Sequence, residues 1–280
     1  LLEAAVPAPV RELQDELEAK LAPSPTELNR YGYDRFGLHP DTARRQMLLP
    51  ALLYRYYFRA ETFGIDHVPH GRVLLIANHA GQLPFDAMML GAAMLLEGDP
   101  PRLARGMGEY WIPQIPFFSW AATRSGNLVG TPENCTALLE AEECVMVFPE
   151  GVRGMNKTFD QAYTLQRFGL GFLRLALDTR TPIVPVGIVG SEEQQPGLAN
   201  AERLGHALGM PAVPITATFP WLGPAGLLPL PVKYRIHIGE PLLFDGAGSD
   251  EDDVIEAKVQ RVRDASHRQL ARRPAEPQRE

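Results

Sequence analysis

The stretch that decides the fold runs from residue 73 to residue 86 and reads VLLIANHAGQLPFD. Its first five residues are apolar without interruption, which is typical of a strand buried on both faces of a sheet. A histidine and a loop containing Gly and Pro follow, and Asp86 then opens an apolar helix expected over residues 86–96. Because sites in open α/β sheets lie beyond the carboxyl ends of the strands, this loop is the first place to look for chemistry.

Short apolar runs alternate with helical segments along most of the remaining chain. This alternation predicts an α/β fold with a mostly parallel central sheet flanked by helices, and with an N-terminal helical segment. We expect residues 1–40 to form a helical appendage, residues 41–272 to form the main domain and residues 273–280 to be a disordered tail. Further strands are expected at residues 127–129, 145–148, 183–188 and 234–238. Helices are expected at residues 10–21, 41–59 with a kink or restart at Pro50, 132 onward, 166–177 and 254–270.

Composition places the chain among globular proteins and excludes several classes of partner. Its 280 residues, 45% of them hydrophobic, suffice for one large α/β domain. The formal net charge is −7 and no basic run dominates, so no nucleic-acid partner is expected. Cys135 and Cys144 have neither metal-ligand spacing nor a disulfide framework, which favours a cytoplasmic location. No apolar run reaches the ~20 residues of a membrane-spanning helix. No signal peptide is visible, and because the sequence begins at Leu1, an upstream segment is left open.

His79 and Asp86 are the first candidates for catalysis. An imidazole at a strand end can take a proton, and a nearby carboxylate can fix its tautomer. No Gly-x-Ser-x-Gly sequence occurs, so a substrate hydroxyl rather than a serine is free to act as the nucleophile. The alternative is that His79 is structural and that Asp86 merely caps the helix it opens. The two interpretations are compatible, since a capping carboxylate can also face the histidine.

A second motif, FPEGVRG at residues 148–154, ends the strand expected at residues 145–148. Its two glycines flank a short loop that carries Arg153, and Lys157 follows closely. Glycines allow backbone amides to approach an anion, and an arginine fork matches a phosphate group. The alternative is an ordinary surface loop built from turn residues.

Taken together, these two motifs resemble the lysophospholipid acyltransferase superfamily. That family shows a His-x4-Asp block, an Arg-bearing block, a Phe-Pro-Glu-Gly block and a final strand containing Val-Pro. The second block falls here near residues 124–130 and the last at residues 183–186, so the resemblance covers residues 58–240. Residues 41–272 would then be the acyltransferase domain.

The spacing of the first block departs from the family pattern. Six residues rather than four separate His79 from Asp86, and Pro84 stands where the family has its aspartate. The longer form resembles the branch related to diacylglycerol acyltransferases, as does the proline-rich segment at residues 219–231. The loop must double back to bring the two side chains together, for which Gly81 and Pro84 are suitable.

The resemblance implies a reaction and roles for named residues. An acyl thioester, on coenzyme A or on acyl carrier protein, would donate its acyl group to a hydroxyl of a glycerolipid or lysolipid. His79 would be the general base, oriented by Asp86. No metal, no further cofactor and no covalent acyl-enzyme are expected. The residues that position the acceptor would be Glu150, Gly151, Arg153 and Arg124.

A lipid substrate implies access to a membrane surface, so we expect a peripheral membrane protein on the cytoplasmic side. Two segments, residues 44–59 and residues 219–232, could provide the contact, although both could instead be core. The membrane or acyl-chain contacts would be Trp221, Leu222, Leu227 and Leu228. Two alternatives to an acyltransferase stay open, namely a thioesterase-like lipid hydrolase and a non-catalytic lipid-binding protein on the same fold. The acceptor also stays open among lysophosphatidate, diacylglycerol and a lyso-aminolipid.

Overall fold

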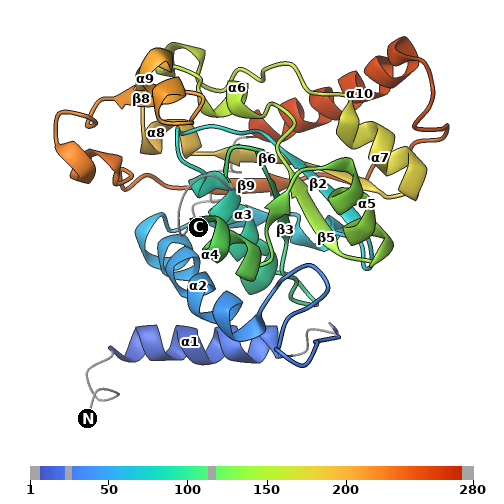
Figure 1. Ribbon diagram of the computed structural model, residues 1–280, viewed down its shortest axis with the longest axis horizontal. Helices are drawn as coiled ribbons and strands as arrows, with labels where there is room; N and C mark the ends of the chain where they lie inside the picture. Colours follow the sequence, from blue (N-terminus) through green and yellow to red (C-terminus); the bar gives the residue numbers. More distant parts are fainter. Residues whose placement is uncertain (1–6, 23–26, 113–117, 273–280) are drawn as a thin grey trace, which may run out of the picture.

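A mixed, mainly parallel sheet forms the centre of the protein (Figure 1). The computed structural model describes residues 7–22, 27–112 and 118–272. Within these residues the central sheet has seven strands in the order β1-β9-β6-β2-β5-β3-β4, and every neighbouring pair is parallel except β6 and β9. The strands are β1 Glu61–Phe63, β2 Val73–Ala77, β3 Arg105–Gly108, β4 Leu128–Val129, β5 Cys144–Val147, β6 Ile183–Val189 and β9 Arg235–Ile238. The predicted fold class is therefore confirmed.

Helices cover both faces of this sheet (Figure 1). α1, α2 and α3 pack on one face, while α5, α7 and α10 pack on the other. A smaller antiparallel pair, β7 Gly197–Ala201 and β8 Val213–Thr216, stands beside the sheet. The α-helices are α1 Ala8–Leu21, α2 Pro40–Leu52, α3 Phe85–Leu96, α4 Phe118–Arg124, α5 Pro132–Glu140, α6 Val152–Met155, α7 Gly171–Thr179, α8 Ser191–Gln194, α9 Glu202–Ala207 and α10 Asp252–Leu270.

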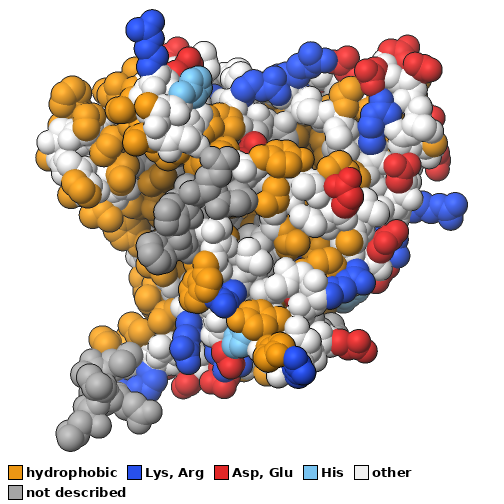
Figure 2. Space-filling model, in the orientation of Figure 1, with side chains coloured by type: hydrophobic (Ala, Val, Ile, Leu, Met, Phe, Trp, Pro, Cys, Tyr) orange, Lys and Arg blue, Asp and Glu red, His pale blue; other side chains and the backbone are white. Residues whose placement is uncertain are grey.

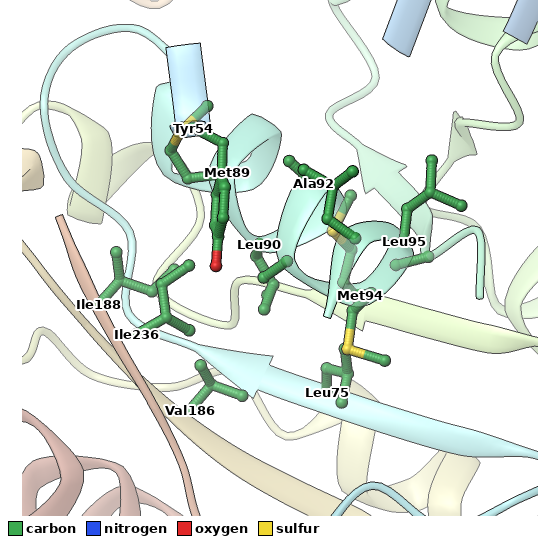
Figure 3. Close-up of a cluster of buried hydrophobic side chains, with 14 of the residues drawn as sticks. Tyr54, Leu75, Met89, Leu90, Ala92, Met94, Leu95, Val186, Ile188 and Ile236 are labelled. Atoms are coloured by element: carbon green, nitrogen blue, oxygen red, sulfur yellow. The ribbon is translucent and has the colours of Figure 1, made fainter. Parts of the chain in front are cut away.

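β2 lies at the middle of the core, which explains its unbroken apolar sequence. Successive side chains of a strand point to opposite faces. Val73, Leu75 and Ala77 accordingly belong to the core under α3, whereas Leu74 and Ile76 belong to the core under α5, α7 and α10. Figure 3 shows Leu75 beside Met94 of α3, and Ile188 of β6 beside Ile236 of β9 in the same cluster. All five residues of β2 are fully buried.

The N-terminal helix shares the main core. Leu13 and Leu17 of α1 are 0% and 1% exposed and pack in the cluster under α3. Arg44 and Arg55 extend toward α1 and form ion pairs with Glu18 and Glu16. The segment at residues 1–40 is thus part of the same hydrophobic unit where it is described, and the predicted tail at residues 273–280 lies outside the described residues.

Pro50 does not restart the helix predicted over residues 41–59. α2 continues through it, and the chain then widens into a π-helical turn at Leu53–Tyr57. Proline lacks the N–H that an α-helix requires, yet α2 passes through Pro50, and the wider turn begins three residues later. Tyr54 and Phe58 are consequently turned into the core, where they are 3% and 0% exposed.

Sequence reasoning misplaced one helix and missed several short strands. α7 begins at Gly171 instead of residue 166 because the Gln166 N–H donates to Glu150 and the Gly169 N–H donates to the Pro149 carbonyl. β1, β3, β7 and β8 are only three to five residues long, and segments that short carry little strand signal. No helix within residues 7–22, 27–112 and 118–272 is long and apolar enough to cross a bilayer.

Candidate active site

His79 lies just beyond the carboxyl end of β2, between the ends of β5 and β6. The preceding residue, Asn78, is fully buried and exchanges two side-chain hydrogen bonds with the backbone of Ile188, at 2.7 and 3.0 Å. Its amide thus continues the pairing of β2 with β6 for one further step. This bridge positions the following histidine at the edge where the loops of three parallel strands meet.

The longer His–Asp loop does double back. Asp86 Oδ2 lies 2.7 Å from His79 Nδ1 and also accepts the Ala80 N–H at 2.9 Å. Gly81 and Gln82 make the reversal possible with φ values of +90° and +62°, in the left-handed region. Asp86 is the second residue of α3 rather than its cap, so its carboxylate is directed to the histidine.

The imidazole of His79 is held through Nδ1, and Nε2 faces no hydrogen-bonding group of the described residues. With the Nδ1–H donated to Asp86, the lone pair is on Nε2. Nε2 makes no hydrogen bond to any residue that the structure describes. The ring also packs against Phe148, with centroids 4.5 Å apart, and 9% of the side chain is exposed. The arrangement can accept a proton from a group placed against Nε2.

Glu150 holds the backbone of this loop. It is 2% exposed, and its Oε1 accepts the His79 N–H at 3.0 Å while its Oε2 accepts the Gln166 N–H at 2.6 Å. Both oxygens are thereby engaged with backbone amides of two loops. The glutamate of the Phe-Pro-Glu-Gly motif therefore fixes the backbone of the loop that carries His79.

Lys157 is a buried cation between two buried carboxylates. Its Nζ lies 3.7 Å from Glu150 Oε2 and 3.4 Å from Glu192 Oε1, and it donates to the Thr164 carbonyl at 3.2 Å. Burial raises the pKa of the Glu192 carboxyl above its ordinary value, and the neighbouring Lys157 opposes that shift. Sequence reasoning placed Lys157 near an anion-binding loop but had no signal that it points inward.

Two glutamines complete the support of the histidine loop. Gln194 is fully buried, donates from Nε2 to the Gly81 carbonyl at 3.3 Å and accepts the Tyr234 hydroxyl at Oε1. Gln82 donates to the Lys157 carbonyl at 2.9 Å. Neither glutamine was identified from the sequence, because nothing in its local neighbourhood marks it.

The other predicted site residues are Gly151, Arg153 and Arg124, and only the first two lie on the loop of Glu150. Gly151 has a φ of +56°, and a Cβ there would lie 2.8 Å from Glu109 Oε1. Arg153 is exposed and donates to the Arg167 carbonyl at 3.1 Å. Arg124 ends α4, where its Nε and Nη2 donate to the Tyr33 hydroxyl at 3.1 and 2.9 Å and its guanidinium stacks on Trp120. Among the described residues, Arg124 makes no hydrogen bond or ion pair with the loops of His79 and Glu150.

The residues expected to contact a membrane or an acyl chain form an exposed segment. Trp221, Leu222 and Leu228 are 69%, 62% and 67% exposed, and Leu227 is half-buried. They lie on the segment around a 3-10 turn at Gly223–Leu227, which leads back toward β9. In the described part of the chain, no group of three or more His, Cys, Asp or Glu side chains could hold a metal ion.

Comparison with known proteins identifies the family. A model of the family named Acyltransferase matches residues 59–189, which include His79, Asp86 and Glu150. An uncharacterized protein of Mycobacterium leprae is 39% identical over 259 residues, which are 90% of this chain and 70% of that protein. An uncharacterized protein of Mycobacterium tuberculosis is 41% identical over 228 residues, and the match covers 80% of this chain and 63% of that protein. The chain therefore spans less than two thirds of the latter relative's length.

Two more distant proteins agree with this placement. The mouse protein described as a DGAT1/2-independent enzyme synthesizing storage lipids is 24% identical over 192 residues, or 66% of this chain and 53% of its own. The crystal structure of the 1-acyl-sn-glycerophosphate acyltransferase of Thermotoga maritima has the same fold, with a TM-score of 0.54 and 16% identity over 83% of this chain and 81% of that chain. Sequence motifs, fold and relatives converge, and the chain belongs to the acyltransferase family.

Proposed function

We propose that the protein transfers a fatty acyl group from an acyl thioester to a hydroxyl of a glycerolipid or lysolipid. The observation that carries this proposal is the buried pair of His79 and Asp86, 2.7 Å apart, with His79 Nε2 left without a partner among the described residues. A base held in this way can act on a substrate hydroxyl without a protein nucleophile.

The proposed reaction follows from the two ends of the imidazole. Nε2 removes the proton of the acceptor hydroxyl as its oxygen attacks the thioester carbonyl. Asp86 keeps the tautomer and stabilises the imidazolium that forms. When the tetrahedral intermediate collapses, the C–S bond breaks and the leaving thiolate takes the proton from Nε2. The products are an ester and a free thiol, and His79 returns to its neutral state.

The donor is proposed to be acyl-CoA or acyl-ACP, and Arg153 to contact an anionic group of the acceptor. The role of Arg153 is supported by the exposure of its side chain beside the Glu150 loop. Its guanidinium makes one hydrogen bond, to the Arg167 carbonyl, which leaves most of its donors available. Gly151 is proposed to let backbone amides approach the same ligand. For Glu150 and Arg124 the contacts favour positioning roles, since Glu150 holds the His79 amide and Arg124 holds Tyr33.

The lipid is proposed to be reached from a membrane surface, with Trp221, Leu222, Leu227 and Leu228 among the contacts. The exposure of three of these four large apolar side chains supports this assignment. The protein would then act as a peripheral membrane protein, which suits a lipid substrate whose acyl chains stay in the bilayer.

The test is to incubate purified protein with labelled acyl-CoA or acyl-ACP and a panel of lipid acceptors. We expect labelled ester product that depends on an acceptor and disappears in His79→Ala. Equal release of free fatty acid with and without acceptor would instead indicate a thioesterase-like hydrolase. Lipid binding without turnover of either thioester would indicate a non-catalytic lipid-binding protein.

A further inference from the structure

One surface of the protein combines large apolar side chains with a near absence of charge. Between Gln194 and Lys233 the sequence carries only two formally charged residues, Glu202 and Arg203, although 22% of the whole chain is charged. We call this part of the exterior the 197–230 surface. Its exposed large apolar residues are Leu198, Leu204, Leu208, Trp221, Leu222, Leu228 and Leu230.

The 197–230 surface is formed by two consecutive parts of the chain. β7, α9 and β8 form the first part, and the segment that surrounds the Gly223–Leu227 turn forms the second. Hydrogen bonds hold the second part against the residues that lead into β7. The Ala217 N–H donates to the Pro196 carbonyl at 3.2 Å, and Gln195 Nε2 donates to the Leu227 carbonyl at 3.2 Å. In Figure 2, hydrophobic side chains gather at the upper left of the molecule, where Figure 1 places α9 and β8.

The backbone of residues 217–231, the proline-rich part, has few N–H groups that would lose hydrogen bonds to water on entering an apolar phase. Pro220, Pro224, Pro229 and Pro231 have no N–H to desolvate. The N–H groups of Leu222, Gly223, Leu228 and Leu230 donate to backbone carbonyls within 2.7–3.2 Å. An irregular segment can enter an apolar phase only if its polar backbone groups are satisfied, and here most of the donors are removed or paired.

The same surface is linked directly to the support of His79. Leu230 donates its N–H to the Gln194 carbonyl at 2.7 Å, and the side chain of Gln194 donates to the Gly81 carbonyl. In the first part, Asn200 Nδ2 donates to the Asn156 carbonyl at 2.6 Å, next to the buried Lys157. The 197–230 surface is therefore continuous, through these hydrogen bonds, with the loops that hold His79.

We propose that the 197–230 surface docks on a lipid bilayer by shallow insertion of its apolar side chains, with α9 as an essential part. This inference rests on the proposed acyl transfer to a lipid and deepens it by naming the contact. Leu204 and Leu208, four residues apart, project from one side of α9 and its end, while Trp221 suits the interface between acyl chains and headgroups. Glu202 and Arg203, the two charged residues of this surface, are exposed at the start of α9, before Leu204. The rest of the surface carries no formal charge, which favours an apolar phase over a partner that is recognised through ion pairs.

A site-specific label tests the docking without disturbing the fold. The native thiols of Cys135 and Cys144 are buried, and burial raises the pKa of each to about 11, so a maleimide dye should react selectively with an introduced cysteine. A polarity-sensitive dye at Leu208→Cys should shift to the blue when phosphatidylcholine vesicles are added. The same dye at Leu243→Cys is the control, because Leu243 is 74% exposed and follows Leu242, which pairs with the opposite, amino end of β6.

A charge-insertion variant gives the second measurement. Leu204→Glu with Leu208→Glu should lower vesicle co-sedimentation about tenfold or more, since withdrawing even one leucine side chain from the bilayer weakens binding by about that factor. Leu243→Glu should bind as the unchanged protein does, and the melting temperatures of all three should agree. Full vesicle binding by the double variant, or no dye shift at residue 208, would overturn the proposal. Light scattering that shows a dimer broken by the double variant would do so too, in favour of a contact between copies.

Docking and chemistry can fail separately in these experiments. His79→Ala should bind vesicles normally while making no ester, because it leaves the 197–230 surface unchanged. A dye shift in a protein that acylates no lipid would uphold docking and refute the proposed function. Acyl transfer with no dye shift would do the reverse.

Discussion

The loops around His79 and the adjoining 197–230 surface differ in where they place charged side chains. Around His79, the charged side chains of Asp86, Glu150, Lys157 and Glu192 are all buried, and each has a hydrogen bond or an ion pair. The 197–230 surface instead exposes large apolar side chains and carries almost no charge. Buried charged groups are thus concentrated around His79, and exposed apolar ones on the surface that we propose to meet a bilayer.

A second pair of regions sharpens this contrast. Residues 44–59 and 219–232 were equal candidates for membrane contact by sequence. In the first, Arg44 and Arg55 are paired with glutamates of α1 and Tyr54 is buried, although Leu49 and Tyr56 stay exposed. The second, all of it among the described residues, has no such ion pairs and exposes Trp221 and Leu228 more fully, at 69% and 67%. Tyr57 connects the two by donating its hydroxyl to the Pro229 carbonyl at 2.6 Å. Substitutions of buried and of exposed charged residues can test whether the buried groups around His79 contribute more to activity and stability than the exposed ones do.

The largest effect is expected at the histidine itself. His79→Ala should lower the rate of acyl transfer by about 10²–10⁴, because general-base catalysis contributes that much. Asp86→Asn should also be slow, since the amide cannot stabilise an imidazolium as a carboxylate does. Turnover numbers are the measurement, and circular dichroism is the control for folding. Near-normal turnover in His79→Ala would remove the proposed mechanism.

Lys157→Met should strongly destabilise the protein. It leaves Glu150 and Glu192 buried without their cation, and breaking a buried ion pair typically costs about 3–5 kcal/mol. Urea denaturation measures the change in the free energy of unfolding. Arg167→Ala is the matched control, since its pair with Glu256 is 70% and 55% exposed and should contribute under about 1 kcal/mol. Equal losses in both variants would contradict the role assigned to the buried cluster.

The pH dependence of stability should report on Glu192. Burial raises its pKa in the folded state, so the folded protein holds this proton more tightly than the unfolded chain does. Its stabilising effect is complete below the ordinary pKa of 4.5 and is lost as the pH rises through the raised value. Glu192→Gln should therefore lose less free energy of unfolding than the unchanged protein as the pH rises above 4.5. An unaltered slope would show that Glu192 is not the titrating group.

The smallest effect is expected at the exposed Arg153. Arg153→Ala should raise the KM for a phosphorylated acceptor more than the KM for a neutral acylglycerol. Because the side chain is exposed, the difference should be about 1 kcal/mol or less, roughly fivefold at most. Arg167→Ala serves as the nearby control. Equal changes for both acceptors would mean that Arg153 supports the loop or the thioester donor instead.

Much of the fold was predictable because it depends on local pattern. The apolar run of β2 and the amphipathic repeat of α10 are short-range signals, and the structure places Ile255, Val259 and Val262 in the core as that repeat requires. Thr131 caps α5 by accepting the Asn134 N–H, as its place before Pro132 predicted. The presence of a histidine and an aspartate in one loop after a buried strand was likewise visible in the sequence, because strand, loop and helix follow one another directly.

Tertiary structure alone decided which way the polar side chains face. Glu150 reaches the amide of a residue 71 positions away, and Gln194 reaches a carbonyl 113 positions away. The inward turn of Lys157, the capture of Arg124 by Tyr33 and the exposure of Leu204 and Leu208 depend on how distant segments pack. The sequence by itself determined the longer strands and helices and the presence of His79 and Asp86 in one loop, since these arise from neighbouring residues. Which residues support that pair, and which surface stays apolar and open, is set by burial, which exists only once the whole chain has folded.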